Sequence, residues 1–245
     1  MKPYPLSIRP YGLRAVLVEW PSTVDEAILE DILCFYRYLK TKCLKDTGWE
    51  MIPAYNSLTL VQNYKLVDFK NFSAKLKKWY AEKSGTIPEQ RYLWRLPVCY
   101  DLDFGIDLEL ASEKLRLSVP EIIEQHTAHV YRVYGIGFLP GFMYLGGLPE
   151  SLEITRKETP RLKVAKGAVG LAGKQTGIYP QESPGGWNII GNCPVSIFNA
   201  KEDHPCLVSV GDQIQFYSIS RAEYDLHKIE GEVGIYKIEK LKIDA

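Results

Sequence analysis

Hydrophobic and polar positions follow two different patterns, one before and one after residue 90. In the first part, short β-rich runs alternate with segments whose apolar residues recur at helical spacing. One such segment begins near Ser22, which is the expected helix cap, and Asp25 stands where a capping box places its acidic residue. A second amphipathic helix is predicted from Asp68. After residue 90 the chain is dense in glycine and proline, and its apolar runs become short.

The first pattern predicts a small α/β domain. Strands are expected at 14–20, 50–53, 57–62 and 92–100, with the two helices between them. The order β-α-β-β-α-β is that of a ferredoxin-like domain, a fold that hosts many functions. The polar segment 84–90, with one glycine and one proline, is the expected linker.

The second pattern predicts a β-barrel preceded by two helices, near Asp107–Leu115 and Val119–His129. Ser118 and Glu121 form a capping box at the start of the second helix. Short strands joined by Gly/Pro turns are then expected at 169–172, 188–190, 195–198 and 213–217. The predicted class is therefore α+β, with an N-terminal α/β domain over residues 1–90 and a barrel domain over 91–245.

Composition and charge narrow the classes of function. Lys+Arg and Asp+Glu are both 30, so there is no basic excess of the kind that nucleic-acid binding needs. The first residues lack the apolar core of a signal peptide, and no window is long and apolar enough for a membrane span. The five cysteines are scattered and form no Cys-x-x-Cys pair. Together these features predict a cytoplasmic protein that binds neither nucleic acid nor membrane.

His126 lies in the middle of the apolar stripe of the second predicted helix. A core histidine that is hydrogen-bonded to its surroundings is the default interpretation. A site histidine that faces the barrel interior is the alternative, because a neutral imidazole can accept or donate a proton near pH 7. No cysteine or carboxylate at ligand spacing completes a site with His126 and His129, so no metal centre is predicted.

Residues 134–148 form an aromatic loop made rigid by glycine and proline. Pro140 stands where a dinucleotide-binding loop has its third glycine, which argues against a Rossmann site. The loop, which includes Phe138 and Gly141, can line an apolar pocket while presenting backbone N–H groups, or it can be a tight barrel corner.

Residues 173–176 (Gly-Lys-Gln-Thr) resemble the end of a phosphate-binding loop. Ala168 occupies the position of the required first glycine, and Gln175 replaces the Ser or Thr that follows the lysine. The sequence therefore predicts no nucleotide site of this type.

Neutral hydrogen-bonding side chains gather between residues 175 and 188, namely Gln175, Thr176, Tyr179, Ser183, Trp187 and Asn188. Such a set suits binding of a small uncharged amide or lactam, and it can stabilise an oxyanion formed from that ligand. Arg161 is the expected partner of a ligand carboxylate. Gln181 stands where a serine-hydrolase elbow has glycine, so Ser183 is not expected to be a nucleophile.

Several long motifs in order resemble one family, that of the B-type subunit of bacterial 5-oxoprolinase, formerly called allophanate hydrolase subunit 1. The family also holds the Kip-type inhibitor of a sensor histidine kinase. The motifs are Gly137-Phe138-Leu139-Pro140-Gly141-Phe142, Tyr144 to Leu148, Pro160-Arg161, Ala172 to Pro180, Ser183 to Trp187 and Ile190-Gly191.

The resemblance implies a cyclophilin-like barrel and an ATP-dependent opening of 5-oxo-L-proline to L-glutamate. It implies as partners a homologous C-type (carboxyltransferase-like) subunit and a third oxoprolinase component. ATP would act at the level of the assembled enzyme, with no site evident in this chain. The matching motif positions give His126, Gln175 and Thr176 as catalytic residues, and as substrate-binding residues Phe138, Pro140, Gly141, Arg161, Tyr179, Ser183 and Trp187.

Two other functions remain open within the resemblance. One is a regulatory inhibitor that docks on a sensor histidine kinase through an exposed surface such as the 138–144 loop. The other is a carboxylase or hydrolase subunit for another small amide, such as urea or allophanate. The chain also departs from the family at Asn192, where arginine is common, and Lys166 is the candidate replacement for that charge.

Overall fold

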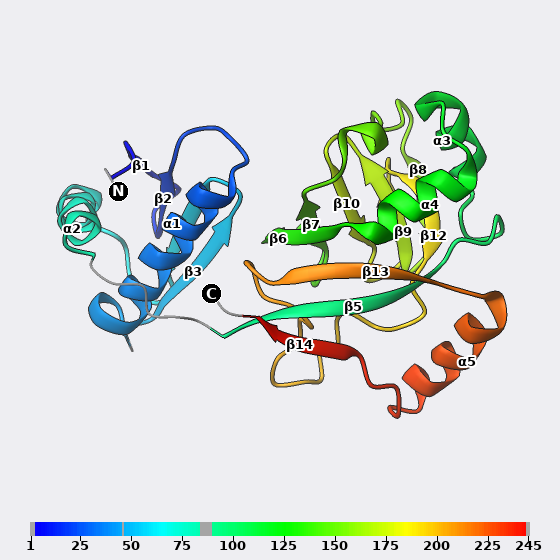
Figure 1. Ribbon diagram of the computed structural model, residues 1–245. Coiled ribbons are helices and arrows are strands. Elements are labelled where there is room, and N and C mark those ends of the chain that lie inside the picture. The colour runs from blue at the N-terminus through cyan, green and yellow to red at the C-terminus, as the bar shows by residue number, and fades with distance from the viewer. Residues whose placement is uncertain (1–2, 46, 84–89, 244–245) are drawn as a thin grey trace. The chain divides into compact units, whose positions relative to one another are not determined.

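The computed structural model describes residues 3–45, 47–83 and 90–243, and the chain divides into two compact units, 1–89 and 90–245 (Figure 1). Each unit is described by itself. The predicted linker at 84–90 lies outside the described residues except for Gln90.

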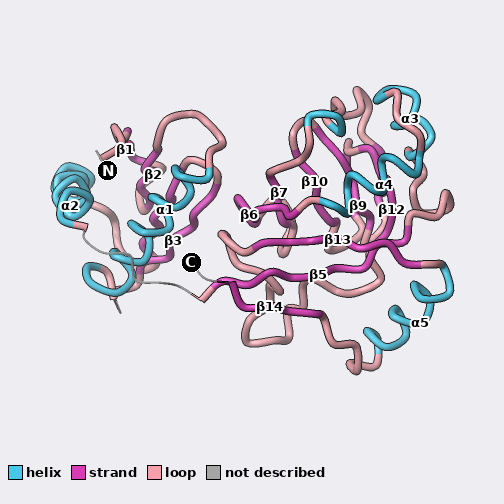
Figure 2. Tube along the Cα trace, in the orientation of Figure 1, coloured by secondary structure: helices cyan, strands magenta, loops and turns pink. Residues whose placement is uncertain are grey.

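The N-terminal unit is one antiparallel sheet with two helices (Figure 2). The strand order is β1-β2-β4-β3. The elements are β1 (Ser7–Pro10), β2 (Ala15–Glu19), α1 (Glu26–Tyr38), a π-helical turn (Leu39–Cys43), β3 (Trp49–Ala54), β4 (Ser57–Gln62) and α2 (Phe69–Glu82).

The core of this unit lies between one face of the sheet and helix α1. Leu58 and Leu60 alternate with more exposed residues along β4, as expected for a strand with one buried face. Ile28, Ile32 and Phe35 lie on one stripe of α1 and are almost wholly buried. Helix α2 begins after Asp68, as predicted, and the Asp68 carboxylate accepts a hydrogen bond from the Asn71 N–H.

Two predictions for this unit were wrong. Helix α1 is capped by Asp25 rather than Ser22: Asp25 has an extended backbone, and its carboxylate accepts the Ile28 N–H at 3.1 Å. The predicted strand at 92–100 does not close this sheet but belongs to the barrel. The edge beside β2 is filled instead by β1, because a short turn lets the two strands pair as a local hairpin.

The C-terminal unit is a closed barrel of seven strands with an eighth strand attached. The strands follow the order β12-β9-β10-β7-β6-β13-β5-β14, and a further pairing of β12 with β5 closes the barrel. The strands are β5 (Arg91–Cys99), β6 (Val130–Ile136), β7 (Met143–Gly146), β9 (Ala168–Ala172), β10 (Gln175–Ile178), β12 (Asn188–Asn192), β13 (Gln213–Ile219) and β14 (Glu239–Ile243). The predicted α+β class, with a small α/β domain before a cyclophilin-like barrel, is confirmed.

Helices and a short ribbon complete the barrel unit. Helices α3 (Leu108–Leu115) and α4 (Val119–Ala128) agree with the prediction, and α4 has the predicted capping box. A two-stranded ribbon pairs β8 (Arg161–Val164) with β11 (Ser183–Gly185). Residues 195–198 form no strand, in contrast to the prediction. The elements that were not predicted include β1, β6, β7, β10, β14 and α5 (Arg221–Glu232).

The capping of α1 provides a test of the fold. Replacing Asp25 by Ala removes the carboxylate that accepts the Ile28 N–H in the first turn of α1, and should lower the free energy of unfolding by about 1 kcal/mol. Ser22→Ala is the matched control and should change it by less than about 0.5 kcal/mol. Urea unfolding of the full chain measures both variants, and a larger effect at Ser22 would contradict the observed cap.

Candidate functional site

His126 and Thr176 meet inside the barrel. His126, on α4, is fully buried, and its Nε2 lies 2.9 Å from the Thr176 hydroxyl on β10. Its Nδ1 lies 2.6 Å from the hydroxyl of Tyr100, and its ring stacks on Phe216 of β13 with centroids 4.7 Å apart. The Thr176 hydroxyl donates its proton to the Gly170 carbonyl, so it accepts from His126 Nε2–H. Nδ1 then accepts the Tyr100 proton.

This environment keeps the imidazole neutral. Burial, reinforced by His129, lowers the pKa of His126 to about 3. Burial also raises the pKa of Tyr100 well above its ordinary value, so the phenol stays protonated and can donate to Nδ1. Both ring nitrogens are therefore occupied. The arrangement holds α4, the end of β5 and β10 in a fixed relation.

An aromatic cluster covers the opposite, outer side of β9 and β10. Phe142 lies at its centre and makes edge contacts to the rings of Tyr144, Tyr179 and Trp187 at centroid distances of 4.9, 5.3 and 5.3 Å. Ala168 and Ala172 of β9 belong to the same cluster, whereas Val169 and Leu171 point into the barrel core. We call the four rings, Phe142, Tyr144, Tyr179 and Trp187, the aromatic face.

Close packing requires glycine at two positions near these rings. A Cβ on Gly177 would lie 2.7 Å from the Met143 carbonyl oxygen and 3.2 Å from the Trp187 ring. Gly141 has φ +82°, and a Cβ there would lie 2.5 Å from Cβ of Phe198. Larger residues at these two positions would displace the loop or the indole. Close packing thus accounts for Gly177 and Gly141, two of the glycines in the Gly-rich motifs.

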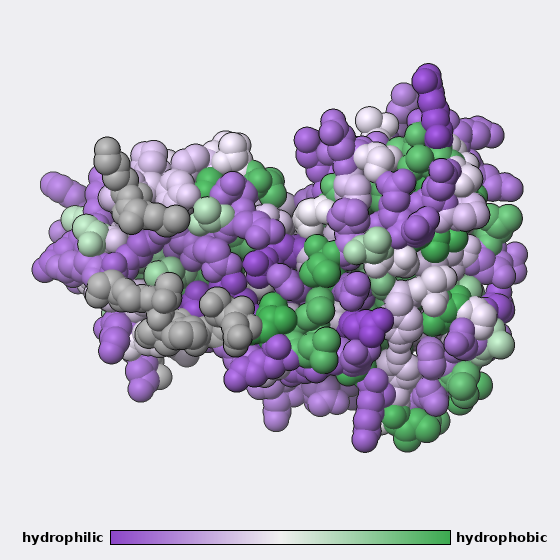
Figure 3. All heavy atoms as spheres, in the orientation of Figure 1, coloured by the Kyte–Doolittle hydropathy of each residue, from purple (hydrophilic) through white to green (hydrophobic). Residues whose placement is uncertain are grey.

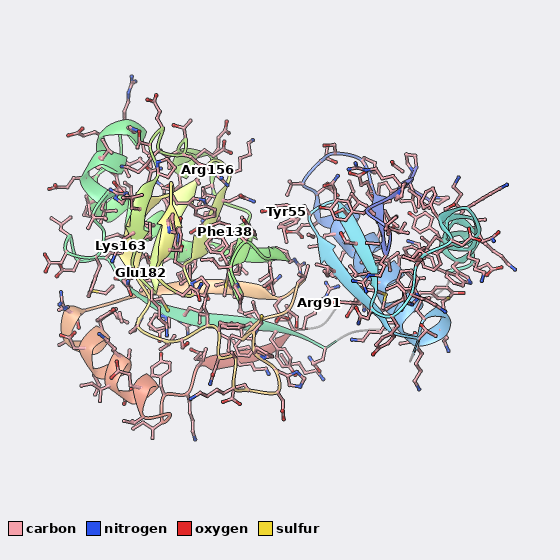
Figure 4. All side chains as sticks on the ribbon, turned by 180° about the vertical axis from the view of Figure 1, so that it is seen from behind. Tyr55, Arg91, Phe138, Arg156, Lys163 and Glu182 are labelled. Carbon is pink, nitrogen blue, oxygen red and sulfur yellow. The ribbon has the colours of Figure 1, made fainter. Side chains whose placement is uncertain are left out.

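Exposed and polar side chains surround the aromatic face. We call Phe138, Pro140, Arg156 and Gln175 its rim. Phe138 is 67% exposed, has φ +67° and contacts Phe142 edge-on, and Pro140 beside it is also exposed. The Arg156 guanidinium lies 5.8 Å from the centre of the Trp187 ring. Gln175 pairs with Ala172 across the β9–β10 hairpin, so its side chain leaves the sheet on this same side. Figure 4 shows Phe138 and Arg156 on the side of the unit that also carries the β8–β11 ribbon.

The Asp107 carboxylate links the start of α3 to the loop that carries Lys157, to β8 and to β12. Its buried carboxylate accepts two hydrogen bonds from Arg161, at 2.6 and 2.7 Å, one from Lys157 and one from the Ile189 N–H. Burial opposes ionisation, but the hydrogen bonds from Arg161 and Lys157 outweigh it and lower the pKa of Asp107. Both terminal nitrogens of Arg161, the predicted carboxylate ligand, are thus engaged by Asp107.

Ser183 and Asn188 lie on either side of Trp187 in sequence. The Ser183 hydroxyl is mostly buried in the ribbon and donates to the Pro184 carbonyl. The Asn188 amide nitrogen donates to the carbonyls of Thr155 and Leu171, while its buried Oδ1 has no hydrogen-bond partner among the described residues. Asn188 therefore brings one unmatched acceptor close to the segment that carries Arg156.

The phosphate-loop-like segment is a tight β-hairpin. Ala172 pairs with Gln175, so Gly173 and Lys174 form a two-residue turn, with Gly173 at φ +58°. Strand β10 follows this turn, so the helix N-terminus that a phosphate loop needs is lacking. Within residues 3–45, 47–83 and 90–243, no group of three His, Cys, Asp or Glu residues is placed to hold a metal ion. No helix in these same ranges is long and apolar enough to span a bilayer.

The structure divides the predicted site residues into three groups. His126 and Thr176 lie inside the barrel, and Arg161 and Ser183 lie on the β8–β11 ribbon. The others belong to the aromatic face, its rim or the adjoining loop, namely Phe138, Pro140, Gly141, Gln175, Tyr179 and Trp187. Asp107, Lys157 and Arg156 were not predicted as site residues. Asp107 stood out only as a helix start. Its charge partners are 50 and 54 residues away, beyond the reach of any local pattern.

The pKa of His126 makes a pH-dependent prediction. In the unfolded chain His126 binds a proton near pH 6.5, whereas in the folded chain it does so only near pH 3. The free energy of unfolding is therefore highest above pH 6.5 and falls as the pH drops toward 3. His126→Ala should remove this dependence and, by leaving a cavity, cost about 2–4 kcal/mol at pH 7. His204→Ala, at an exposed position, is the control. Urea unfolding across this pH range measures the effect, and unchanged pH profiles in His126→Ala would contradict the assignment.

Asp107 makes a second pH-dependent prediction, in a lower pH range than that of His126. Because its folded pKa lies below 3.8, its stabilisation is present above that value and is lost as the pH falls through the folded pKa. Asp107→Asn should lower the free energy of unfolding at pH 7 by about 3 kcal/mol, since Arg161 and Lys157 lose their partner. Glu182→Gln breaks an exposed ion pair with Lys163 and should cost less than about 0.5 kcal/mol. Equal losses in the two variants would contradict the anchoring role of Asp107.

Comparison with known proteins gives a consistent family. The family described as "Carboxyltransferase domain, subdomain C and D" matches residues 6–208. The B-type subunit of 5-oxoprolinase from Bacillus subtilis is 38% identical over 191 residues, covering 74% of this chain and 80% of the relative. That of Haemophilus influenzae is 35% identical over 211 residues, covering 86% and 97%.

Solved structures agree in fold. The crystal structure of TTHA0988 is 30% identical with a TM-score of 0.72 over 85% of this chain, which spans 40% of that protein. The K. lactis urea amidolyase has a TM-score of 0.79 over 99% of this chain, at 19% identity and over 16% of its own length, which shows the fold alone. Because the family match spans residues 6–208 and the relatives are 35–38% identical over most of their length, the chain belongs to the carboxyltransferase-domain (subdomain C and D) family, which includes the B-type subunits of 5-oxoprolinase.

Proposed function

We propose that this chain is one subunit of an ATP-dependent 5-oxoprolinase, which converts 5-oxo-L-proline to L-glutamate. The observation that carries the proposal is the 35–38% identity to three curated proteins, each named as the B-type subunit of a 5-oxoprolinase. The proposed partners are a homologous, carboxyltransferase-like C-type subunit and a third oxoprolinase component. The enzyme is proposed to be cytoplasmic, in keeping with five cysteines that are all free thiols.

The rim of the aromatic face suits this substrate class, because Phe138 is exposed there whereas Phe142, Tyr179 and Trp187 are buried beneath it. The lactam ring of 5-oxoproline is small and nearly flat, so it can lie against aromatic side chains such as Phe138 at the rim. Its carboxylate needs a cation, and Arg156 stands over Trp187 with an exposed side chain. Gln175 on the same side can donate to the lactam carbonyl. This assignment replaces Arg161 by Arg156 as the direct carboxylate ligand, because Arg161 is engaged by Asp107.

In this proposal His126 and Thr176 do not contact the ligand, because they lie on the barrel side of β10. Of the two roles expected for His126, proton transfer and orientation, its burial and low pKa favour orientation. The hydrogen bond to Thr176 fixes β10, and β10 presents Gln175 to the other side of the sheet. We therefore assign both residues as positioning groups for the strand that bears Gln175. Loss of turnover in a His126→Ala enzyme that remains folded is the expected consequence.

ATP is assigned to another component of the assembled enzyme. The segment of this chain that most resembles a phosphate loop forms a β-hairpin, so its residues do not fit the nucleotide. In this account the isolated chain does not turn over substrate. It supplies part of the amide site, and a partner supplies the activated phosphate.

Two alternatives have specific support. An inhibitor of a sensor histidine kinase would need an exposed, shaped loop, and Phe138 with its strained backbone offers one. A subunit acting on another small amide, such as urea or allophanate, is favoured by the fold shared with urea amidolyase. The first alternative predicts a stable complex with a kinase, and the second predicts turnover with the other amide in place of 5-oxoproline.

The site assignment is tested in the assembled enzyme. Arg156→Met should raise KM for 5-oxoproline by about tenfold or more, since an ion pair to the carboxylate is lost. Lys163→Met removes an exposed cation of the neighbouring ribbon and should leave KM unchanged. The measurement is 5-oxoproline-dependent ADP release as a function of substrate concentration. Equal KM values for wild type and Arg156→Met would exclude Arg156 as the carboxylate ligand.

A further inference from the structure

Helix α5 turns an apolar stripe to solvent. Its inner side is anchored by Tyr224, which is buried and donates to Asn192 Oδ1 at 3.0 Å. On the opposite side Leu226, Ile229 and Val233, the residue that ends the helix, are 53%, 59% and 64% exposed. Figure 3 shows apolar atoms gathered at the lower right, where Figure 1 places α5 and the turn that follows it.

The spacing of this stripe is that of a helix-pairing seam. Ala222, Leu226, Ile229 and Val233 follow one another at intervals of four, three and four residues, and all four are exposed. This is the repeat by which two helices pack knobs into holes. Single exposed apolar residues are ordinary, but a contiguous apolar stripe on a folded protein marks an interaction surface. We call these four residues the α5 seam.

The charges beside the seam select the partner. The positions that flank it on its two sides are Glu223 and Glu230 on one side and Asp225 and Glu232 on the other. All four are acidic. Asp225 lies 3.5 Å from Arg221 and Glu230 lies 3.1 Å from His227 within the same helix, whereas Glu223 and Glu232 have no basic partner in an ion pair among the described residues of α5. A second copy docked seam to seam would place carboxylate against carboxylate in either orientation, and an anionic membrane would be repelled in the same way. Lysine or arginine at the flanking positions of the partner would instead form complementary pairs.

We propose that the α5 seam is a docking surface for an amphipathic helix of another protein, with apolar residues at the same spacing and basic residues beside them. The proposal goes beyond the function proposed above and does not depend on it. The family match ends at residue 208, so α5 lies outside the matched region. The surface is thus argued from this chain's own residues alone.

A designed peptide tests the surface. The probe is a fluorescein-labelled three-heptad peptide with leucine at the seam positions and lysine at the flanking positions, and its control differs only in having glutamate at the flanks. Fluorescence anisotropy with the full chain should show saturable one-to-one binding of the lysine peptide, weakened by salt, and no binding of the glutamate peptide. Ile229→Ser should weaken binding by about tenfold or more. Leu102→Ser, in the turn before α3 and 51% exposed, is the matched control.

Charge reversal gives the sharper readout. The double variant Asp225→Lys/Glu232→Lys should lose preference for the lysine peptide and bind the glutamate peptide better than the wild-type chain does. Equal binding of the two peptides by the wild-type chain, or binding that Ile229→Ser leaves unchanged, would overturn the proposal. So would a concentration-dependent dimer of the chain, measured by light scattering, that Ile229→Ser abolishes, because the occupant would then be a second copy.

Discussion

The carboxylate of Asp107 is the constraint on which the candidate site depends. It is buried at the start of α3, and it binds Arg161 of β8, Lys157 of the preceding loop and the backbone of Ile189 in β12. The Lys157 N–H in turn donates to the Gly186 carbonyl, next to Trp187. One desolvated anion with two cations therefore sets the position of the ribbon and of the indole. Without it, the segment that carries Arg156 and Lys157 would lose its tie to α3 and β12.

Strand β10 joins the barrel core to the aromatic face. Successive positions of a strand face opposite sides of the sheet. The Thr176 side chain therefore points into the barrel, whereas positions 175 and 177 face its outer side. Thr176 is held by His126, and Gly177 admits the Trp187 ring. The interior histidine can thus affect the outer face without touching a ligand. In the proposed function, residues on the two sides of this sheet therefore contribute to one site: Gln175 faces the ligand, and His126 and Thr176 position the strand.

Local patterns predicted the elements well where the signal is local. The capping box of Ser118 and Glu121 correctly placed α4, and the amphipathic spacing after Asp68 correctly placed α2. The same type of signal, Ser220 with Glu223, was present at α5 and was overlooked. The β-rich run of β5 could not show which sheet the strand joins, because pairing with β13 depends on residues more than a hundred positions away.

The sequence predicted which residue types belong to the candidate site, but it did not predict how those residues contact one another. Gln175, Tyr179 and Trp187 were expected from their neutral polar and aromatic character, and the structure brings them to one side of β10. The partners of His126 lie 26 and 50 residues away, and nothing in the helix pattern identifies them. Arg161 was expected to bind a ligand because nothing near it in the sequence identifies another partner. Its hydrogen bonds to Asp107 join residues 54 positions apart and form only on folding.

The central claim is that this chain is a necessary subunit of an enzyme that opens a small lactam at the expense of ATP. The most direct measurement is 5-oxoproline-dependent ADP formation by the complex that co-purifies with the tagged chain, compared with the same components prepared without it. The account predicts stoichiometric ADP and L-glutamate from the complete complex and neither product when this chain is left out. Full activity of the partners alone would contradict the account.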